Sequence, residues 1–217
     1  MLKFFGIGST QTTASVAQDL TLQAIRGYWD AKRVAGDLPQ RAAIDPRGMA
    51  DQLDKVFLIE RISKGNARFR LAGMHLHDLM GMDLRGMPVT AMFMPEARER
   101  IAVELQAVFE SPAVVELSLE AERGLGRPAV SGRMLLLPLT NRAGEVELAL
   151  GCLVSEGQLG RAPRRFAING VRRDDLFPQE QPSFTGLKVV AETATTARMQ
   201  RPLPRPKPKL RLVGSES

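Results

Sequence analysis

Two histidines, His75 and His77, are the residues of this 217-residue chain whose type and spacing most directly suggest acid–base or metal chemistry. They stand two positions apart on an expected helix, and side chains with that spacing point to different faces. A metal ion needs ligands that converge on one point, so we expect no metal shared by the pair. One histidine could still face an internal pocket, although surface positions are more common for this residue type.

The sequence contains no recognisable catalytic motif. It has no Gly-x-Ser-x-Gly elbow, no Walker loop and no His-Glu-x-x-His pair. Asp54, Glu60 and Glu104 are carboxylates, but nothing pairs them as an acid and a base. The segment Gly124-Leu-Gly-Arg-Pro-Ala129 formally matches a dinucleotide fingerprint, yet Pro128 and a strand follow it instead of a helix. We therefore expect a hairpin turn there, and an enzyme is not indicated.

The single cysteine, Cys152, excludes an intramolecular disulfide and a cysteine-rich metal site. It lies in an apolar segment, where a thiol is usually a small buried hydrophobe. The longest apolar run, Met134–Leu139, is far shorter than the roughly 20 residues that cross a bilayer, and the N-terminal stretch lacks a signal-peptide cleavage site. We expect a cytoplasmic protein without an integral membrane segment.

The net charge of +6 originates in the C-terminal part of the chain. Residues 1–155 carry 18 basic and 18 acidic side chains, whereas residues 156–217 carry 12 and 6. Residues 201–211 hold four prolines and five positive charges, a composition typical of an extended, solvated arm. Binding of this arm to nucleic acid or anionic lipid would weaken steeply with salt, and we do not expect nucleic acid as a partner.

The expected elements that position these residues begin with an amphipathic helix over residues 16–34. Asp45 and Pro46 are typical of the start of a short helix, and a further short helix follows Gly73. A longer helix begins at Pro95 and ends near Phe109. The remaining elements are strands at 56–62, 67–72, 113–122, 129–140 and 145–155, joined by loops too short for parallel crossovers.

The apolar patterns of these five strands predict their order. Strands at 56–62, 129–140 and 145–155 are apolar at consecutive positions, as expected when both faces are buried. The strands at 67–72 and 113–122 alternate apolar with polar residues, which we interpret as edge strands. The sheet is then antiparallel in the order 2-1-5-4-3, with helices on one face. The first helix, which carries Tyr28 and Trp29, is the candidate cover for the other face.

Several short motifs resemble the PAS-like domain family that is common in alphaproteobacteria. They occur in order over about residues 18–155: Arg26-Gly-Tyr-Trp-Asp30, Leu38-Pro39, Arg41-Ala-Ala-Ile-Asp-Pro46, Val56-Phe-Leu-Ile-Glu60, Arg68-Phe-Arg-Leu-Ala-Gly73 and Leu84-Arg-Gly86. The resemblance implies an α+β, PAS-like domain over residues 16–155 that acts as a sensory or regulatory module in the bacterial cytoplasm. It leaves residues 1–15 as a flexible N-terminus and 156–217 as a partly disordered basic tail. Apolar side chains could anchor the start of this tail: Phe166, Ile168, Val171, Leu176 and Phe177.

A ligand pocket is expected between the inserted helices and the sheet. Position in the fold alone suggests its lining: Phe57, Phe69, Met74, His75, Met92 and Phe93. The cofactor is unknown, and the chain lacks the Gly-x-Asn-Cys motif of flavin-binding light sensors.

The predicted function is therefore signalling through a small molecule and a partner protein. The alternative is a ligand-free adaptor or homodimerisation module that uses Tyr28 and Trp29, or an edge strand, to contact a signalling protein or a second copy. A weaker alternative is nucleic-acid association through the tail. Fold resemblance alone does not decide among these functions.

Overall fold

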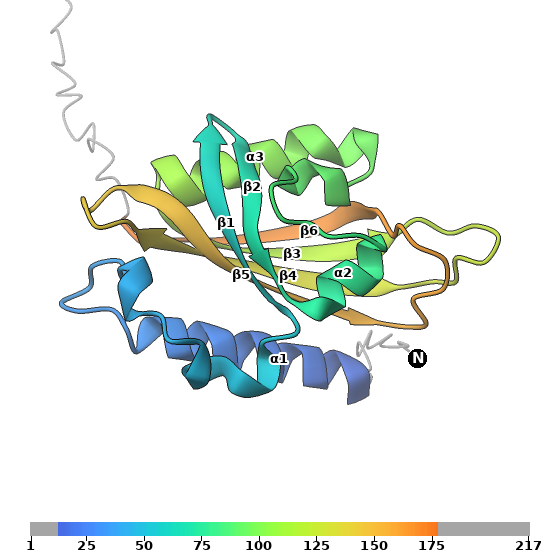
Figure 1. Ribbon diagram of the computed structural model, residues 1–217, viewed down its shortest axis with the longest axis horizontal. Coiled ribbons are helices and arrows are strands. Elements are labelled where there is room, and N and C mark those ends of the chain that lie inside the picture. The colour runs from blue at the N-terminus through green and yellow to red at the C-terminus, as the bar shows by residue number, and fades with distance from the viewer. Residues whose placement is uncertain (1–12, 178–217) are drawn as a thin grey trace, which may run out of the picture. The chain divides into compact units, whose positions relative to one another are not determined.

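The computed structural model describes residues 13–177, and the expectations for residues 1–12 and for the proline-rich segment 201–211 lie outside the described residues. Within this part, a strongly twisted antiparallel sheet has helices on both faces (Figure 1). The sheet has six strands in the order β2-β1-β5-β4-β3-β6. The strands are β1 (Val56–Ser63), β2 (Asn66–Ala72), β3 (Ala113–Ala121), β4 (Ser131–Thr140), β5 (Val146–Glu156) and β6 (Phe166–Asp175).

The sixth strand corrects the expectation of a five-stranded sheet with β3 at its edge. β6 pairs antiparallel with β3 from Ala113 opposite Asp175 to Ala121 opposite Phe166. The alternation of apolar and polar residues in β3 indicates that one face of the strand is polar. It does not show whether the backbone of β3 pairs with a further strand. The segment that the sequence analysis assigned to the basic tail therefore contains a strand of the same sheet.

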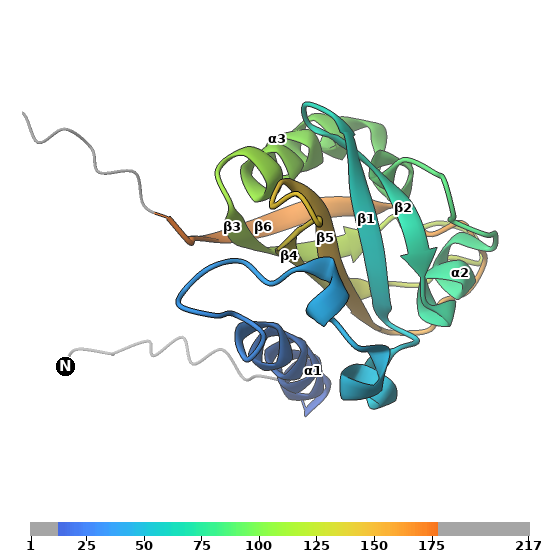
Figure 2. The same cartoon turned by 60° about the vertical axis from the view of Figure 1, so that its left-hand side comes forward.

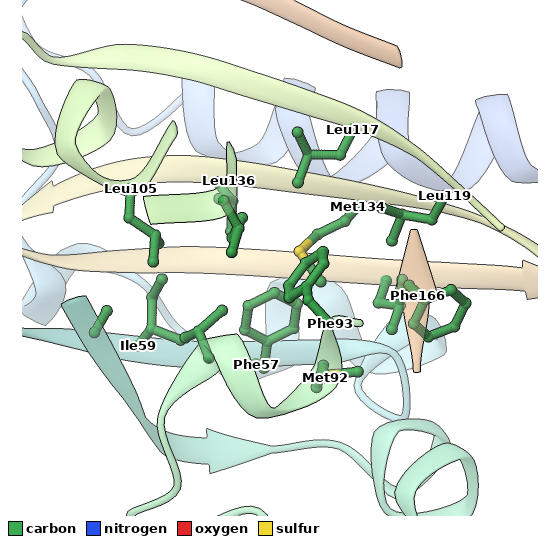
Figure 3. Packing of buried hydrophobic residues seen from close by; sticks show 14 of the residues in the cluster. Phe57, Ile59, Met92, Phe93, Leu105, Leu117, Leu119, Met134, Leu136 and Phe166 are labelled. Atoms are coloured by element: carbon green, nitrogen blue, oxygen red, sulfur yellow. The ribbon is translucent and has the colours of Figure 1, made fainter. Parts of the chain in front are cut away.

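One face of the sheet is covered by α2 (Met74–Met80), α3 (Arg98–Glu110) and the 3₁₀ helices η3 (Val89–Met92) and η4 (Pro95–Ala97). Gly81 ends α2 with a φ of +68°, in the left-handed region that glycine adopts without a steric penalty. Between these helices and the sheet lies a cluster of buried apolar side chains, the inner core (Figure 3).

The other face is covered by α1 (Thr13–Asp30) and by the 3₁₀ helix η2 (Pro46–Gln52), which lie on the opposite side from α3 (Figure 2). Leu22, Ile25 and Trp29 of α1 join the apolar outer residues of β1, β4 and β5 in a second cluster, the outer core. The Trp29 indole donates a hydrogen bond to the Pro138 carbonyl oxygen at 3.0 Å. The apolar face of α1 thus covers the sheet of its own chain.

A fully buried arginine holds the loop between β5 and β6 in place. The Arg164 guanidinium donates hydrogen bonds to the carbonyl oxygens of Glu122 (3.0 Å), Pro128 (2.6 Å) and Leu159. Its backbone amide also donates to the Leu79 carbonyl oxygen at 2.8 Å. Burial lowers the pKa of Arg164, but the three carbonyl acceptors compensate for much of the lost hydration. The arginine therefore links β6 to β3, β4 and α2.

Candidate functional site

Four of the six residues expected to line the inner pocket lie in the packed inner core. Phe57, Phe69, Met92 and Phe93 are each 0–1% exposed, and the rings of Phe57 and Phe69 meet edge to face with centroids 5.5 Å apart. Figure 3 shows Phe57, Met92 and Phe93 pointing into the space between the sheet and the helices. All four belong to the same cluster of buried apolar side chains. They are therefore packed together where the pocket was expected, and their role as a pocket lining stays a prediction.

The other two expected pocket residues lie elsewhere. Met74 is 65% exposed at the start of α2. His75 is half-buried, and its Nε2 lies 3.0 Å from the Ser155 hydroxyl oxygen of β5. Burial lowers the pKa of His75, and the nearby Asp54 carboxylate partly opposes that effect. The His75 imidazole therefore links α2 to the end of β5.

The second histidine has a different partner, as its spacing predicted. His77 Nε2 lies 3.1 Å from the Ala72 carbonyl oxygen and donates to it. Among residues 13–177, no group of three or more histidine, cysteine or acidic side chains is arranged to hold a metal ion. In the same range, no helix is long and apolar enough to cross a membrane.

Tyr28 and Trp29, the expected interaction surface, point toward their own chain. Trp29 is fully buried in the outer core. The Tyr28 hydroxyl donates to the Asp45 carbonyl oxygen (2.9 Å) and accepts from the Asp45 amide (2.8 Å). The Tyr28 ring also occupies the space beside Gly48 that a Cβ would need. This aromatic pair joins α1 to η2 and the sheet, so it is not a free surface for a partner.

Cys152 lies fully buried on the outer face of β5. Burial raises the pKa of its thiol to about 12, which leaves very little nucleophilic thiolate near neutral pH. The residue serves as a small apolar side chain.

An apolar pocket of about 170 Å³ lies between η2 and the β1–β2 hairpin, on the outer face of the sheet. Leu58 and Leu150 belong to its sheet side, and Ile44 and Met49 to its helical side. Arg41 is the only charged residue of the lining. The remaining lining residues are Pro46, Leu53, Val56, Phe57, Leu71, Ala72 and Gly73. We call this the outer pocket.

A second, polar hollow adjoins the outer pocket and shares Arg41, Leu58 and Leu71 with it. Glu60, Arg70 and Arg85 also line this polar hollow, together with Asn141, Glu147 and Leu148. Glu60 accepts hydrogen bonds from Arg68 (2.8 and 3.0 Å) and from Arg70 (2.5 Å), and these bonds lower its pKa. The apolar outer pocket therefore lies directly beside a hollow that is rich in arginine.

The outer pocket was not predicted from the sequence, because one helix was expected to cover the whole outer face. A sequence signal did exist in the consecutive apolar residues of β1, whose outer face needs a cover. Helix α1 packs on β4 and β5, whereas the short η2 lies near β1 and leaves the pocket open. Leu53 and Leu71, 41% and 54% exposed, lie in its lining.

Comparison with known protein families decides the classification. Residues 17–154 match the family model of the PAS domain. This chain belongs to the PAS domain family. The family resemblance expected from the motifs is thereby confirmed.

Among solved structures, the PAS domain is similar to a sensory box histidine kinase/response regulator from Burkholderia thailandensis E264. The two share 18% sequence identity over 51% of this chain and 84% of that chain, with a TM-score of 0.34. No match to a curated protein was found.

Both β6 and Arg164 lie beyond the residues matched by the PAS family model. The outer pocket, in contrast, is built entirely from residues inside the matched range. The outer pocket thus lies on the α1 side of the sheet, while the buried apolar cluster of the inner core lies on the α3 side.

Proposed function

We propose that this PAS domain is a sensory or regulatory module of bacterial signalling, which acts in the cytoplasm by binding a small molecule and contacting a partner protein. The outer pocket is its input site. The observation that carries this proposal is an apolar pocket of about 170 Å³ in a PAS domain whose inner core is filled. A cavity of about 150 Å³ accommodates a molecule the size of benzene.

The contacts around the outer pocket could transmit a conformational change from a bound ligand to helix α1. Met49 of η2 lines the pocket, and η2 is joined to α1 through the two hydrogen bonds between Tyr28 and Asp45. A ligand that displaced η2 would therefore act on α1, because the two helices share this link. In this role the domain binds the ligand and does not convert it chemically.

The proposal is tested with the full chain purified from cells, by native mass spectrometry and an absorbance scan before and after denaturation. We expect a small molecule that is released on denaturation. The variant Leu71→Trp, which adds bulk to the pocket lining, should lose that molecule. The control Ile62→Trp changes another exposed side chain of the same hairpin, 57% exposed and outside the lining, and should retain it. A ligand-free chain, or equal loading of both variants, would contradict the proposal.

A ligand-free adaptor is the second candidate function. The exposed Leu53 and Leu71, which lie together in the lining of the outer pocket, and the exposed Ile62 of the same hairpin as Leu71 favour it, because exposed apolar side chains promote association. Sedimentation of the ligand-free chain over a concentration series tests homodimerisation, and pull-down tests a different partner. A monomeric mass together with no reproducible partner would exclude the adaptor.

A further inference from the structure

The outer pocket and the polar hollow form one composite surface with two chemical characters. The pocket is apolar except for Arg41, and the polar hollow continues from Arg41 to Arg70 and Arg85. A shallower hollow around Glu60, Arg70 and Arg85 adds Arg68. A ligand that fits both parts must have an apolar end and a polar end.

The charge of the polar part is positive. Four arginines, Arg41, Arg68, Arg70 and Arg85, stand against two carboxylates, Glu60 and Glu147. Glu60 is already bound by Arg68 and Arg70. Within residues 13–177, neither Arg41 nor Arg85 forms a salt bridge, and Arg41 Nη1 donates only to the Ile44 carbonyl oxygen at 3.2 Å. The surplus charge favours an anionic group on the ligand.

Arg41 lies where the two parts meet, because it lines both hollows. A guanidinium presents five N–H donors in a planar fork, which matches a carboxylate. Its contact with Ile44 leaves donors for such a group. An apolar chain or ring in the outer pocket would then have its carboxylate beside Arg41.

We propose that the outer pocket binds a small amphipathic carboxylate, such as a short-chain acyl or monocyclic aromatic acid, with its apolar part between η2 and the β1–β2 hairpin and its carboxylate at Arg41. This inference rests on the proposed function and specifies the ligand class of the same site. The volume of about 170 Å³ limits the apolar part to one ring or a short chain. A long acyl chain exceeds this space.

The inference is tested by titrating the full chain with hexanoate, 1-hexanol and hexylammonium, three unbranched probes of six carbons each with different head groups. Methyl NMR of Met49 reports occupation of the pocket, and calorimetry gives the affinities. We expect hexanoate to bind about tenfold more tightly than 1-hexanol, the ratio that corresponds to about 1.4 kcal/mol, and hexylammonium to bind most weakly.

Two substitutions, each with a matched control, test the charge of the site and its cavity separately. Arg41→Gln should abolish the preference for hexanoate over 1-hexanol while both still bind, and Arg47→Gln, on the exposed side of η2, should retain the preference. Leu71→Trp should lose both probes, and Ile62→Trp should bind them as the unsubstituted chain does.

The possible results distinguish this inference from the proposed function. Equal binding of hexanoate and 1-hexanol to the unsubstituted chain would overturn the carboxylate inference and leave the outer pocket as a site for neutral ligands. A preference that survives Arg41→Gln would overturn the assignment to Arg41. Failure of all three probes to shift Met49 would overturn both the inference and the use of this pocket as an input site.

Discussion

The inner and outer faces of the sheet differ in how their side chains are covered. The inner face is covered by α2, α3 and short 3₁₀ helices, and its core consists of apolar side chains that reach 0% exposure along β1, β3, β4 and β5. The outer face is apolar over much of β4 and β5 and at Leu58 of β1, and it becomes charged at Glu60 of β1 and over β3 and β6. The inner face therefore contributes mainly to stability. The outer face contains the outer pocket and a row of ion pairs around Glu116, which we call the polar seam.

The polar seam of the outer face is centred on Glu116 of β3. This carboxylate pairs with Arg133 of β4 and with Arg172 of β6, the latter at 2.7 Å. Arg133 also pairs with Asp19 of α1, and Arg26 of α1 pairs with Asp174 of β6 at 2.6 Å. Helix α1 is thus held to the sheet by apolar contacts over β4 and β5 and by ion pairs at β4 and β6.

The inner core should give the largest effect of any single substitution. Phe93→Ala removes a fully buried ring from the inner core. We expect a loss of about 3–5 kcal/mol in the free energy of unfolding, measured by chemical denaturation of the full chain. A loss below about 1 kcal/mol would show that the inner core is looser than the exposures indicate.

Arg164→Leu should have the next largest effect, because it removes the buried guanidinium that donates to three carbonyl oxygens, two of them in the loop between β3 and β4. The buried carbonyls of Glu122, Pro128 and Leu159 would lose this donor, and we expect destabilisation of about 3 kcal/mol. Hydrogen exchange would report the loss first in β6. Arg165→Leu, at the exposed neighbouring position, is the control. Equal protection of β6 in both variants would contradict the assigned role.

Glu116→Gln tests the polar seam and should have a smaller effect. The substitution keeps the shape of the side chain and removes the charge that faces Arg133 and Arg172. We expect destabilisation of about 1–2 kcal/mol at low ionic strength, with a smaller difference at about 1 M salt because ion pairs near the surface are screened. Phe93→Ala should show no such reduction with salt. A salt-independent effect of Glu116→Gln would remove the contrast between the two faces.

His75 should give the smallest effect, visible only as a pH dependence. Its pKa in the folded chain lies below the ordinary value of 6.5 because of burial, so the unfolded chain takes up the proton first as the pH falls. The free energy of unfolding should therefore decrease as the pH falls below about 6.5, with a slope of at most about 1.4 kcal/mol per pH unit from this group. His75→Gln should flatten the curve between pH 7 and the acid range. An unchanged curve would show that His75 is not responsible.

Most of the fold could be predicted from local patterns in the sequence. The hairpin of β1 and β2, the helix that begins at Pro95 and the three strands that follow it lie close to where the periodicity places them. Helix α1 ends at Asp30, before the expected Val34, and Ala35 adopts a positive φ in the turn that follows. β6 was missed because Gly170 and the charged run that follows it mask the short apolar alternation at its start.

The candidate site was predicted less well, for a physical reason. Phe57, Phe69, Met92 and Phe93 were correctly expected to share the space between helices and sheet, but sequence cannot show whether such side chains surround a cavity or fill it. The difference between the two depends on side-chain rotamers and small changes in packing, which are set by the tertiary structure. The position of Arg41 between two hollows likewise follows from the tertiary arrangement of η2 and the hairpin.

The position of β6 has a consequence for how the chain folds. β3, β4 and β5 follow one another in the sequence and pair locally, whereas β6 completes the sheet only after the loop fixed by Arg164 has turned back to β3. Until residue 175 has been synthesised, β3 presents an open edge, and an open strand edge is a template for pairing with other chains. A chain that stops at residue 155, close to the end of the family match, would keep that edge permanently exposed. We therefore expect residues 13–155 to aggregate more readily than residues 13–177, because only the longer segment covers the edge of β3.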